Sequence, residues 1–415
     1  MNKLLVISCL LLLSSSLNAQ RFEDYFEDRT LRIDYTFAGD NSQSSIYVDE
    51  LVSLPHWYGK RYRLNEVPLK GNGQIIMRSH QKEEVIYRHS FSTLFQEWMS
   101  TEEAKHTKKS FENIFLVPFP KDTIDITVEL YDYHDKTAVS MTHTVIPTDI
   151  LIRKAGERDV TPYDVLQQAK DSSNCIHIAF VAEGYTADEM EHYLNDCQQA
   201  ISALFRHEPF KSLQDRFNMI ALKSVSEESG TSEPSKGIWK HTALASHFDT
   251  FYSDRYLTTL HLKQLHNLLA GTPYEHIIIL VNTEHYGGGG IFNSYNLSYT
   301  GGKYFLPVVV HEFGHSFGGL GDEYAYGNDD PMYFADTEPW EPNLTTQHRF
   351  IGKWEDLVKE GQAGLFEGGG YLTNGVWRGC ENCRMRTNEE PDFCIVCRRA
   401  LTRLIDFYTQ PTTDK

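Results

Sequence analysis

Apolar and polar residues alternate through the first third of the chain. Three clear stretches of this kind lie at 31–37, 74–79 and 124–130, with turn residues between them at short intervals. A period of two predicts strands that bury one face, and short, regularly spaced strands are typical of an antiparallel sandwich. We therefore predict an all-β sandwich over residues 20–150. It contains no catalytic pattern, so we expect a scaffold, or a spacer, lid or surface that helps to select the substrate.

From about residue 160 the pattern changes to continuous apolar runs separated by helical stretches. An apolar run without alternation predicts a strand that is buried on both faces. A capping box at Thr186–Glu189 predicts a helix that extends to about Arg206. The other predicted elements are strands at 175–181, 217–225 and 277–281 and helices at 257–269 and 393–408. This pattern predicts an α/β domain over residues 160–415.

The first nineteen residues have a basic start, a short apolar run and small residues near their end. These features predict a secretory signal peptide, residues 1–19, that is cut after Ala19. The apolar run is too short to span a membrane, and no later stretch is long enough. We expect an exported protein without a membrane span, either periplasmic or secreted.

Length and charge bear on the number of domains and on the class of partner. The chain has 415 residues, more than a single hydrophobic core usually serves, which predicts two domains. Its formal net charge is −18. So strong a negative charge argues against nucleic acid or an anionic membrane as a partner.

The most informative motif is His-Glu-x-x-His at residues 311–315. His311 and His315 are four positions apart, so on a helix they share one face and can bind the same metal ion. The carboxylate of Glu312 can then reach a water on that metal instead of the metal itself. Two imidazoles and one further ligand would leave the fourth position of Zn²⁺ open, as in a catalytic site. The preceding apolar stretch, with Pro307 in the first turn, predicts a buried helix.

The third ligand is predicted from the glycines that follow. In the related pattern H-E-x-x-H-x-x-G-x-x-H, the last His is a ligand, but here a glycine stands at that position. Asp322 comes next and stands three residues after Gly319, which is the usual interval between glycine and ligand. We predict Asp322 as the third ligand, with Glu323 in reserve. A more distant ligand such as Glu338 or Glu341 would leave the glycine turn unexplained.

A methionine in a tight turn beneath the zinc often accompanies this kind of site. Met385 is the candidate, because it follows the zinc helix within the same predicted domain and precedes the last predicted helix. The alternative is a methionine that only fills a gap in the core.

A glycine-rich segment at 286–293 precedes the zinc helix and predicts an edge strand. Gly288, Gly289 and Gly290 would let another backbone come close. In zinc proteases such an edge commonly pairs with an extended peptide substrate. A flexible hairpin without that role is the alternative.

Four late cysteines form two pairs, Cys380-x-x-Cys383 and Cys394-x-x-Cys397. Their spacing suits a structural zinc site. In an exported protein disulfides are the commoner use of cysteine pairs, so we expect disulfides, with their connectivity open. Since the pairs flank Met385, either chemistry would clamp its loop to the last helix.

Several segments occur together in the order found in one known family. They are Glu183–Thr186, Ser253–Thr259, Gly287–Gly290, His311–Tyr324, Cys383–Met385 and Phe393–Cys397. Together they resemble the IgA-peptidase family of metzincin-like zinc metallopeptidases, and the front region resembles the β-rich N-terminal domain that often precedes it. The resemblance implies a secreted bacterial zinc endopeptidase with ligands His311, His315 and Asp322 and with Glu312 as catalytic acid/base. It does not imply cleavage of immunoglobulin A, because many members have no established substrate.

We therefore predict a β-sandwich followed by an α/β metzincin-like zinc metallopeptidase domain, with one catalytic Zn²⁺. The expected partner is a protein or peptide substrate, with a host glycoprotein among the candidates. One alternative is a zinc amidohydrolase that acts on a non-protein or glycoprotein linkage. Another is a binding or adhesion protein with a relict zinc site.

Overall fold

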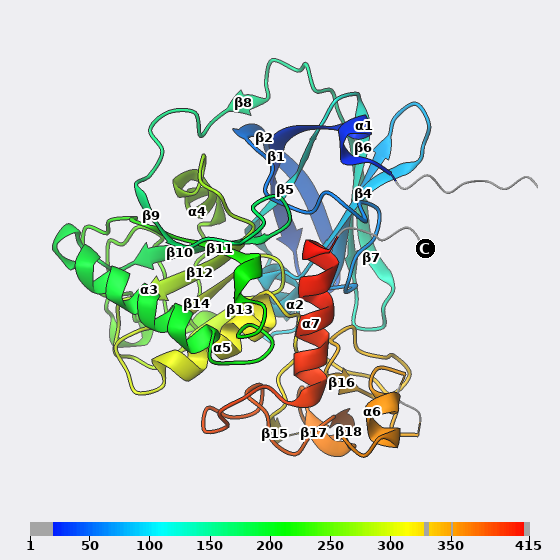
Figure 1. Ribbon diagram of the computed structural model, residues 1–415, viewed down its shortest axis with the longest axis vertical. Coiled ribbons are helices and arrows are strands. Elements are labelled where there is room, and N and C mark those ends of the chain that lie inside the picture. Colours follow the sequence, from blue (N-terminus) through cyan, green and yellow to red (C-terminus); the bar gives the residue numbers. More distant parts are fainter. Residues whose placement is uncertain (1–19, 328–331, 350–351, 411–415) are drawn as a thin grey trace, which may run out of the picture.

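The computed structural model describes residues 20–327, 332–349 and 352–410, and the predicted signal peptide lies outside these ranges. The strands gather into an N-terminal sandwich, a central six-stranded sheet and a small C-terminal sheet. Helix α7 rises from the C-terminal sheet beside the central sheet (Figure 1). Among the described residues, no helix has the length and apolar character that a membrane crossing requires.

The sandwich consists of two four-stranded sheets, in the orders β5-β1-β2-β8 and β4-β3-β6-β7. All three predicted strands are present. In β6, residues Ile124, Ile126, Val128 and Leu130 are buried and alternate with less buried residues, as a one-sided strand requires. The bounds are β1 Phe26–Gly39, β2 Ser44–Pro55, β3 Gly73–Ser79, β4 Val85–Phe91, β5 Lys109–Pro120, β6 Ile124–Tyr131, β7 Thr137–Val145 and β8 Arg153–Lys154, with short helices α1 Phe22–Tyr25 and α2 Leu94–Met99.

The central sheet has the order β13-β14-β12-β10-β11-β9. Its four inner strands are parallel, and the edge strands β13 and β9 run antiparallel to their neighbours. Strands β10 and β12 are buried along their whole length, as their continuous apolar sequences predict. The bounds are β9 Tyr163–Gln167, β10 Ile176–Glu183, β11 Phe217–Leu222, β12 His276–Val281, β13 Gly288–Ile291 and β14 Tyr295–Tyr299.

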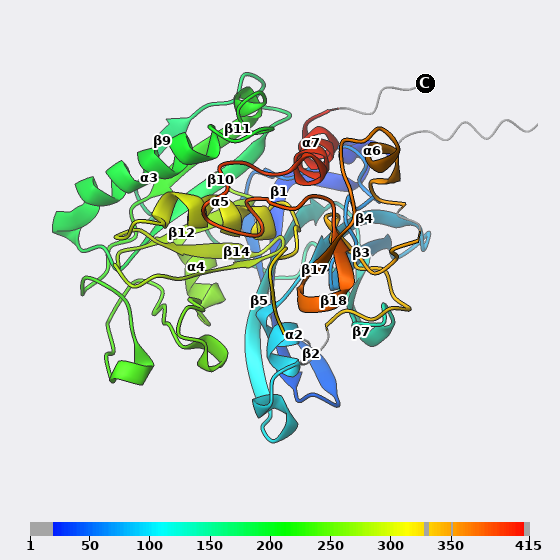
Figure 2. The ribbon, with the colours of Figure 1, turned by 90° about the horizontal axis from the view of Figure 1, so that it is seen from below.

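The two faces of this sheet pack against different elements. Ile178 and Phe180 of β10 share a core with helices α3 (Met190–Leu204), α5 (Phe305–Ser316) and α7 (Ile395–Thr409). Their neighbours Ala179 and Val181 belong to a second core, which contains α4 (Leu262–Leu268) and the sandwich. Figure 2 shows the sandwich beside the central sheet, with α3 and α4 on opposite sides of that sheet. The two domains therefore share one continuous hydrophobic core.

Polar contacts also cross this boundary. Arg32 donates to the Asn267 side chain over 2.8 Å, and the Ser92 amide donates to the Phe292 carbonyl over 3.0 Å. Arg32 itself is buried with Asp34 in an ion pair of 2.7 Å. A spacer attached through a flexible linker would not bury such groups, so the sandwich is a fixed part of the molecule.

Three elements of the central domain have bounds that differ from the predicted ones. The capping box at Thr186 is present, but it opens a short 3₁₀ turn, and α3 follows at Met190. The helix predicted at 257–269 begins only at Leu262. The prediction was wrong for residues 257–261, because Thr258 pairs with His247 instead of entering the helix. The strand predicted at 217–225 ends at Leu222.

The C-terminal region forms a small sheet in the order β15-β18-β16, to which β17 is added through β18. The last helix, α7, leaves this region and returns to the central core, close to the predicted span 393–408. The bounds are β15 Ala325–Gly327, β16 Leu344–Thr345, α6 Glu355–Lys359, β17 Phe366–Gly369 and β18 Tyr371–Arg378.

Candidate metal centre and substrate cleft

Helix α5 carries the His-Glu-x-x-His motif on a buried scaffold. Its apolar side chains, including Val309 and Phe313, pack into the core, and Pro307 lies in the first turn as predicted. The helix therefore presents His311 and His315 on one face, where their Nε2 atoms lie 3.0 Å apart.

The glycine turn brings Asp322 back to the two histidines. Gly319 has φ of +57°, a left-handed conformation that suits glycine. Asn343, in the turn before β16, braces this glycine turn: its side chain accepts from the Gly321 amide over 2.8 Å and donates to the Gly321 carbonyl over 2.9 Å. Asp322 Oδ1 lies 3.0 Å from His311 Nε2 and 3.2 Å from His315 Nε2. The three predicted ligands thus meet at one point.

The donor atoms have the chemistry of a cation site. His311 Nδ1 faces the Arg384 carbonyl at 3.0 Å, and His315 Nδ1 faces the Leu320 carbonyl at 2.6 Å. Because carbonyls only accept, each Nδ1 carries a proton and donates it to its carbonyl, which leaves each Nε2 as the nitrogen that faces Asp322. Asp322 Oδ1 is buried there without a hydrogen-bond partner. Donors around one tetrahedral zinc stand about 3.3 Å apart, so this set fits the ion.

The charges of His311, His315 and Asp322 also favour a bound cation. Burial alone would raise the pKa of the Asp322 carboxyl, but the adjacent histidines outweigh it and hold that pKa well below its ordinary value. Burial likewise disfavours charge on His315, yet the negative charge of Asp322 raises the His315 pKa to about 9. Asp322 is therefore an anion that attracts positive charge, whether a proton or a metal, to the histidines.

The glycine-rich strand β13 lies directly over Glu312. A Cβ at Gly288 would stand 2.7 Å from Glu312 Oε1, and one at Gly290 would stand 2.6 Å from the Glu312 carbonyl. A Cβ at Gly289 would meet the Tyr256 ring at 2.6 Å. The glycines thus let β13 approach α5 closely, and their role in admitting a substrate backbone stays a prediction. Burial raises the pKa of Glu312, which suits a group that must take up a proton.

β13 is an edge strand, as predicted, but this edge is partly covered. The Gly288 amide donates to the Arg255 carbonyl over 3.3 Å, and the Gly288 carbonyl accepts from the Leu257 amide over 3.2 Å. Pairing of an extended substrate along this edge stays a prediction, and at Gly288 it would require that segment to move.

Met385 lies beneath α5. It is fully buried, and a Cβ on Gly314 would stand 2.6 Å from its sulfur, so the helix rests directly on this side chain. The Met385 carbonyl accepts from the Glu323 amide over 2.8 Å, which ties its loop to the segment that carries Asp322. Met385 therefore lies under the helix that carries the two histidines, and its role as a methionine turn stays a prediction.

A cavity of about 750 Å³ opens above these residues. Its floor includes His311, Glu312 and His315. The sandwich supplies part of the wall through Glu97, Tyr131 and Tyr133, and Glu97 also accepts a hydrogen bond from Tyr256. Other lining residues are the aromatic side chains of Tyr286, Tyr324, Tyr326, Tyr333, Trp340 and Tyr371. The sandwich, which contains no catalytic pattern, therefore helps to form the candidate substrate cleft.

Comparison with protein families identifies the chain. A family model described as IgA Peptidase M64 matches residues 165–363 and 360–405, and one described as Peptidase M64 N-terminus matches residues 21–142. The chain belongs to the IgA peptidase M64 family. M64 peptidases are metallopeptidases, and their substrates are proteins or peptides. The two matched regions agree with the two predicted domains. A search of curated proteins finds no match.

The sequence did not point to Tyr371, although it contacts the candidate metal centre of this M64 peptidase. Its hydroxyl donates to Asp322 Oδ2 over 2.5 Å, so one carboxylate oxygen is held while the other faces the histidines. Tyr371 lies in β18, far along the chain from α5, and no local pattern marks it. Arg384, whose carbonyl orients His311, was likewise noticed only as a neighbour of Met385.

The reserve ligands lie elsewhere. Glu323 points away from the histidines and accepts a hydrogen bond from Asn343 over 2.9 Å. Glu338 accepts from Thr345 over 2.9 Å, and Glu341 accepts from Tyr333 over 3.1 Å. Both line the cavity, but within the described residues the group around the histidines contains only Asp322 as a carboxylate.

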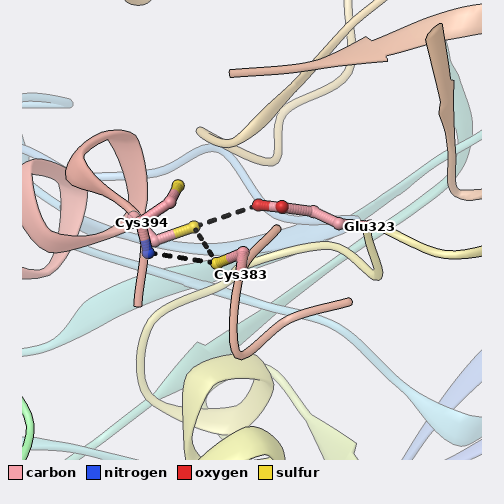
Figure 3. A group of neighbouring side chains, drawn as sticks. Glu323, Cys383 and Cys394 are labelled. Carbon is pink, nitrogen blue, oxygen red and sulfur yellow. Dashed lines mark hydrogen bonds between the residues drawn. The ribbon is translucent and has the colours of Figure 1, made fainter. Parts of the chain in front are cut away.

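The expected disulfides are not found. All six cysteines among the described residues are free, including the four of the late pairs. Cys383, Cys394 and Cys397 instead gather with Glu323 around a buried point, whereas Cys380 is partly exposed and outside this group. Figure 3 shows Glu323 reaching toward Cys383 and Cys394 from the opposite side.

Proposed function

We propose that this M64 peptidase is a zinc-dependent endopeptidase with a metzincin-like catalytic domain. The observation that carries the proposal is the convergence of His311 Nε2, His315 Nε2 and Asp322 Oδ1 on one point beside Glu312, on the floor of an open cavity. Two imidazoles and a carboxylate are ligands that zinc accepts, and three protein ligands leave room for a fourth. Export to the periplasm or out of the cell is proposed from the pattern of residues 1–19 alone.

Zinc in this position would lower the pKa of water to about 7 and polarise the carbonyl of the scissile peptide bond. Glu312 would accept the proton of the attacking water and pass it to the leaving amine. The raised pKa of this buried carboxyl brings it closer to the range in which a group both accepts and releases protons. Tyr371 and the carbonyls of Leu320 and Arg384 would hold the ligands in orientation.

The test is Glu312→Gln, with Glu389→Gln as its control. Glu389 lines the same cavity but is exposed and lies far from the histidines in the chain. Both variants and the wild type are assayed on a denatured protein and a peptide library, and metal content is measured on the same samples. We expect Glu312→Gln to keep its zinc and to lose about 10²–10⁴-fold in turnover, while Glu389→Gln stays near the wild type.

Two results would contradict the proposal. Cleavage by Glu312→Gln at the wild-type rate would remove the acid/base role. Absence of cleavage of any protein or peptide by zinc-loaded wild type would favour a non-peptide amide as substrate, or a binding protein.

A further inference from the structure

A second group of metal-ligating side chains lies away from the cleft. Glu323, Cys383, Cys394 and Cys397 each offer one donor atom, and these atoms lie within 4.8 Å of one another. Glu323, Cys383 and Cys397 are fully buried, and Cys394 is 8% exposed. None of the four is among the described residues that line the cavity. Such a set needs an explanation because buried polar and ionisable groups are costly without partners.

The distance between Cys383 and Cys397 excludes a disulfide between these two residues and suits a shared metal. Cys383 Sγ and Cys397 Sγ lie 3.7 Å apart, whereas a disulfide requires about 2.0 Å. With Zn–S bonds of about 2.3 Å, two sulfurs on a tetrahedral zinc stand about 3.8 Å apart. Cys397 Sγ also lies 3.2 Å from Glu323 Oε1, in the range for a sulfur and an oxygen that share one ion.

Glu323 supplies a separate indication of a missing partner. Its Oε1 accepts from Asn343 and Cys397, but its Oε2 is buried without a hydrogen-bond partner. Figure 3 shows this carboxylate directed at the cysteine sulfurs. A carboxylate at zero exposure is rare unless it is paired or binds a metal.

We propose that Glu323, Cys383, Cys394 and Cys397 bind a second zinc ion with a structural role. Binding would release the three thiol protons to solvent and form three Zn–S bonds and one Zn–O bond, a closed tetrahedral set. Three thiolates and a carboxylate outweigh the charge of Zn²⁺. Arg378 and Arg384 lie close enough to interact with the charge on Cys383 and offset that excess.

This second ion would position the first. Glu323 follows Asp322 directly, and its amide donates to the Met385 carbonyl. Cys383 precedes Arg384, whose carbonyl orients His311. A metal that joins Glu323 to Cys383 and to the start of α7 would fix the Asp322 segment and the Met385 loop together. These four residues are positioning residues and do not touch the substrate cleft.

The experiment compares wild type with Glu323→Gln, Cys397→Ser and Cys380→Ser in the full chain. Cys380 is the matched control, since it belongs to the same sequence pattern and contacts Cys394 but is not one of the four grouped ligands. Zinc per chain is measured with and without a mild chelator. The same proteins are denatured in chelator without reductant and alkylated, and the modified cysteines are mapped.

We expect two zinc ions in wild type and in Cys380→Ser, and one in Cys397→Ser. Glu323→Gln, which keeps an oxygen for Asn343, should fold and lose its second zinc to the mild chelator. All four late cysteines should be alkylated. One zinc in wild type, or late cysteines blocked as disulfides, would overturn the proposal. Loss of zinc from Cys380→Ser but not from Glu323→Gln would overturn the assignment of Glu323. Because the readouts are metal content and thiol chemistry, they do not depend on peptidase activity.

Discussion

Two neighbouring residues, Asp322 and Glu323, serve two contrasting groups. Asp322 faces two imidazoles at the floor of an open cavity, and Glu323 faces three thiols in a closed part of the core. The histidine side chains remain 12% and 16% exposed, whereas Cys383 and Cys397 are fully buried. Nitrogen and oxygen ligands with access for a substrate are typical of catalytic zinc, and a closed thiolate-rich set is typical of structural zinc.

One short segment, Asp322 and Glu323, joins the open histidine group to the buried cysteine group. The turn that brings Asp322 to the histidines is short and rich in glycine, and would be mobile without support. Asn343 supports it from the turn before β16, since its side chain forms hydrogen bonds with both Gly321 and Glu323. The cluster of Cys383, Cys394 and Cys397 supports the same turn from the other side, through Glu323.

The largest expected effect is selective removal of the open metal. Brief treatment of the native wild type with a strong chelator should abolish peptide cleavage and leave about one zinc per chain, because only the histidine group opens to the cavity. Zinc content and activity are followed over time on one sample. Loss of both ions at the same rate would show that the two groups do not differ in access.

The next effect concerns the strand above Glu312. Gly288→Ala would place a Cβ 2.7 Å from Glu312 Oε1 and displace that carboxylate. Since a misplacement of about 1 Å at a catalytic group can cost about 10²-fold, we expect a loss of that order in kcat with zinc retained. Gly327→Ala is the control, because a Cβ there meets nothing within 4 Å. Equal kcat for both variants would argue against contact between β13 and Glu312.

Tyr371→Phe should act on the metal and not on the acid/base. Without its hydroxyl, Asp322 Oδ2 loses a hydrogen bond of 2.5 Å. Loss of a group that orients a metal ligand typically weakens binding by about 10–100-fold. Competition with a chromophoric chelator measures the affinity of the open site. Tyr326→Phe, at an exposed tyrosine of the same cavity, should not change it. Unchanged zinc affinity in Tyr371→Phe would contradict the assigned role.

The smallest expected effect tests the wall that the sandwich contributes. Burial raises the pKa of Glu97 to about 7. A raised folded-state pKa stabilises the protein below the unfolded value, and this contribution is lost as pH rises through about 7. Between pH 5 and pH 8 the wild type should therefore lose about 1–2 kcal/mol of stability, allowing for partial solvent access, that Glu97→Gln does not lose.

Urea unfolding of zinc-loaded protein at pH 5, 6, 7 and 8 measures this difference. Glu102→Gln is the control, since Glu102 is exposed and the adjacent Lys105 lowers its pKa away from this range. Parallel stability profiles for wild type and Glu97→Gln would mean that Glu97 is solvated and does not form a dry wall of the cleft.

The sequence predicted those features that local geometry determines. A spacing of four on a helix must place His311 beside His315, and a turn of glycines must follow if Asp322 is to return to them. The alternation in β6 likewise required one buried face. In each case the relevant residues are near neighbours in the chain.

What the sequence did not predict depends on distant packing. Tyr371 reaches the Asp322 segment from β18 and Asn343 from the turn before β16, and Glu97 reaches the cleft from the other domain. The cysteine spacing was compatible with either chemistry, and the disulfide expectation followed cellular context instead of geometry. The opposite orientations of Asp322 and Glu323 could not be read from two adjacent acidic residues.

The most direct measurement is zinc content with peptide cleavage, on the same samples of wild type and Asp322→Ala. The account predicts that the variant loses the open-site zinc, retains the thiol-bound zinc and no longer cleaves peptides. An Asp322→Ala protein that keeps its full metal content and cleaves at the wild-type rate would contradict it, because the metal and the reaction would then lie elsewhere.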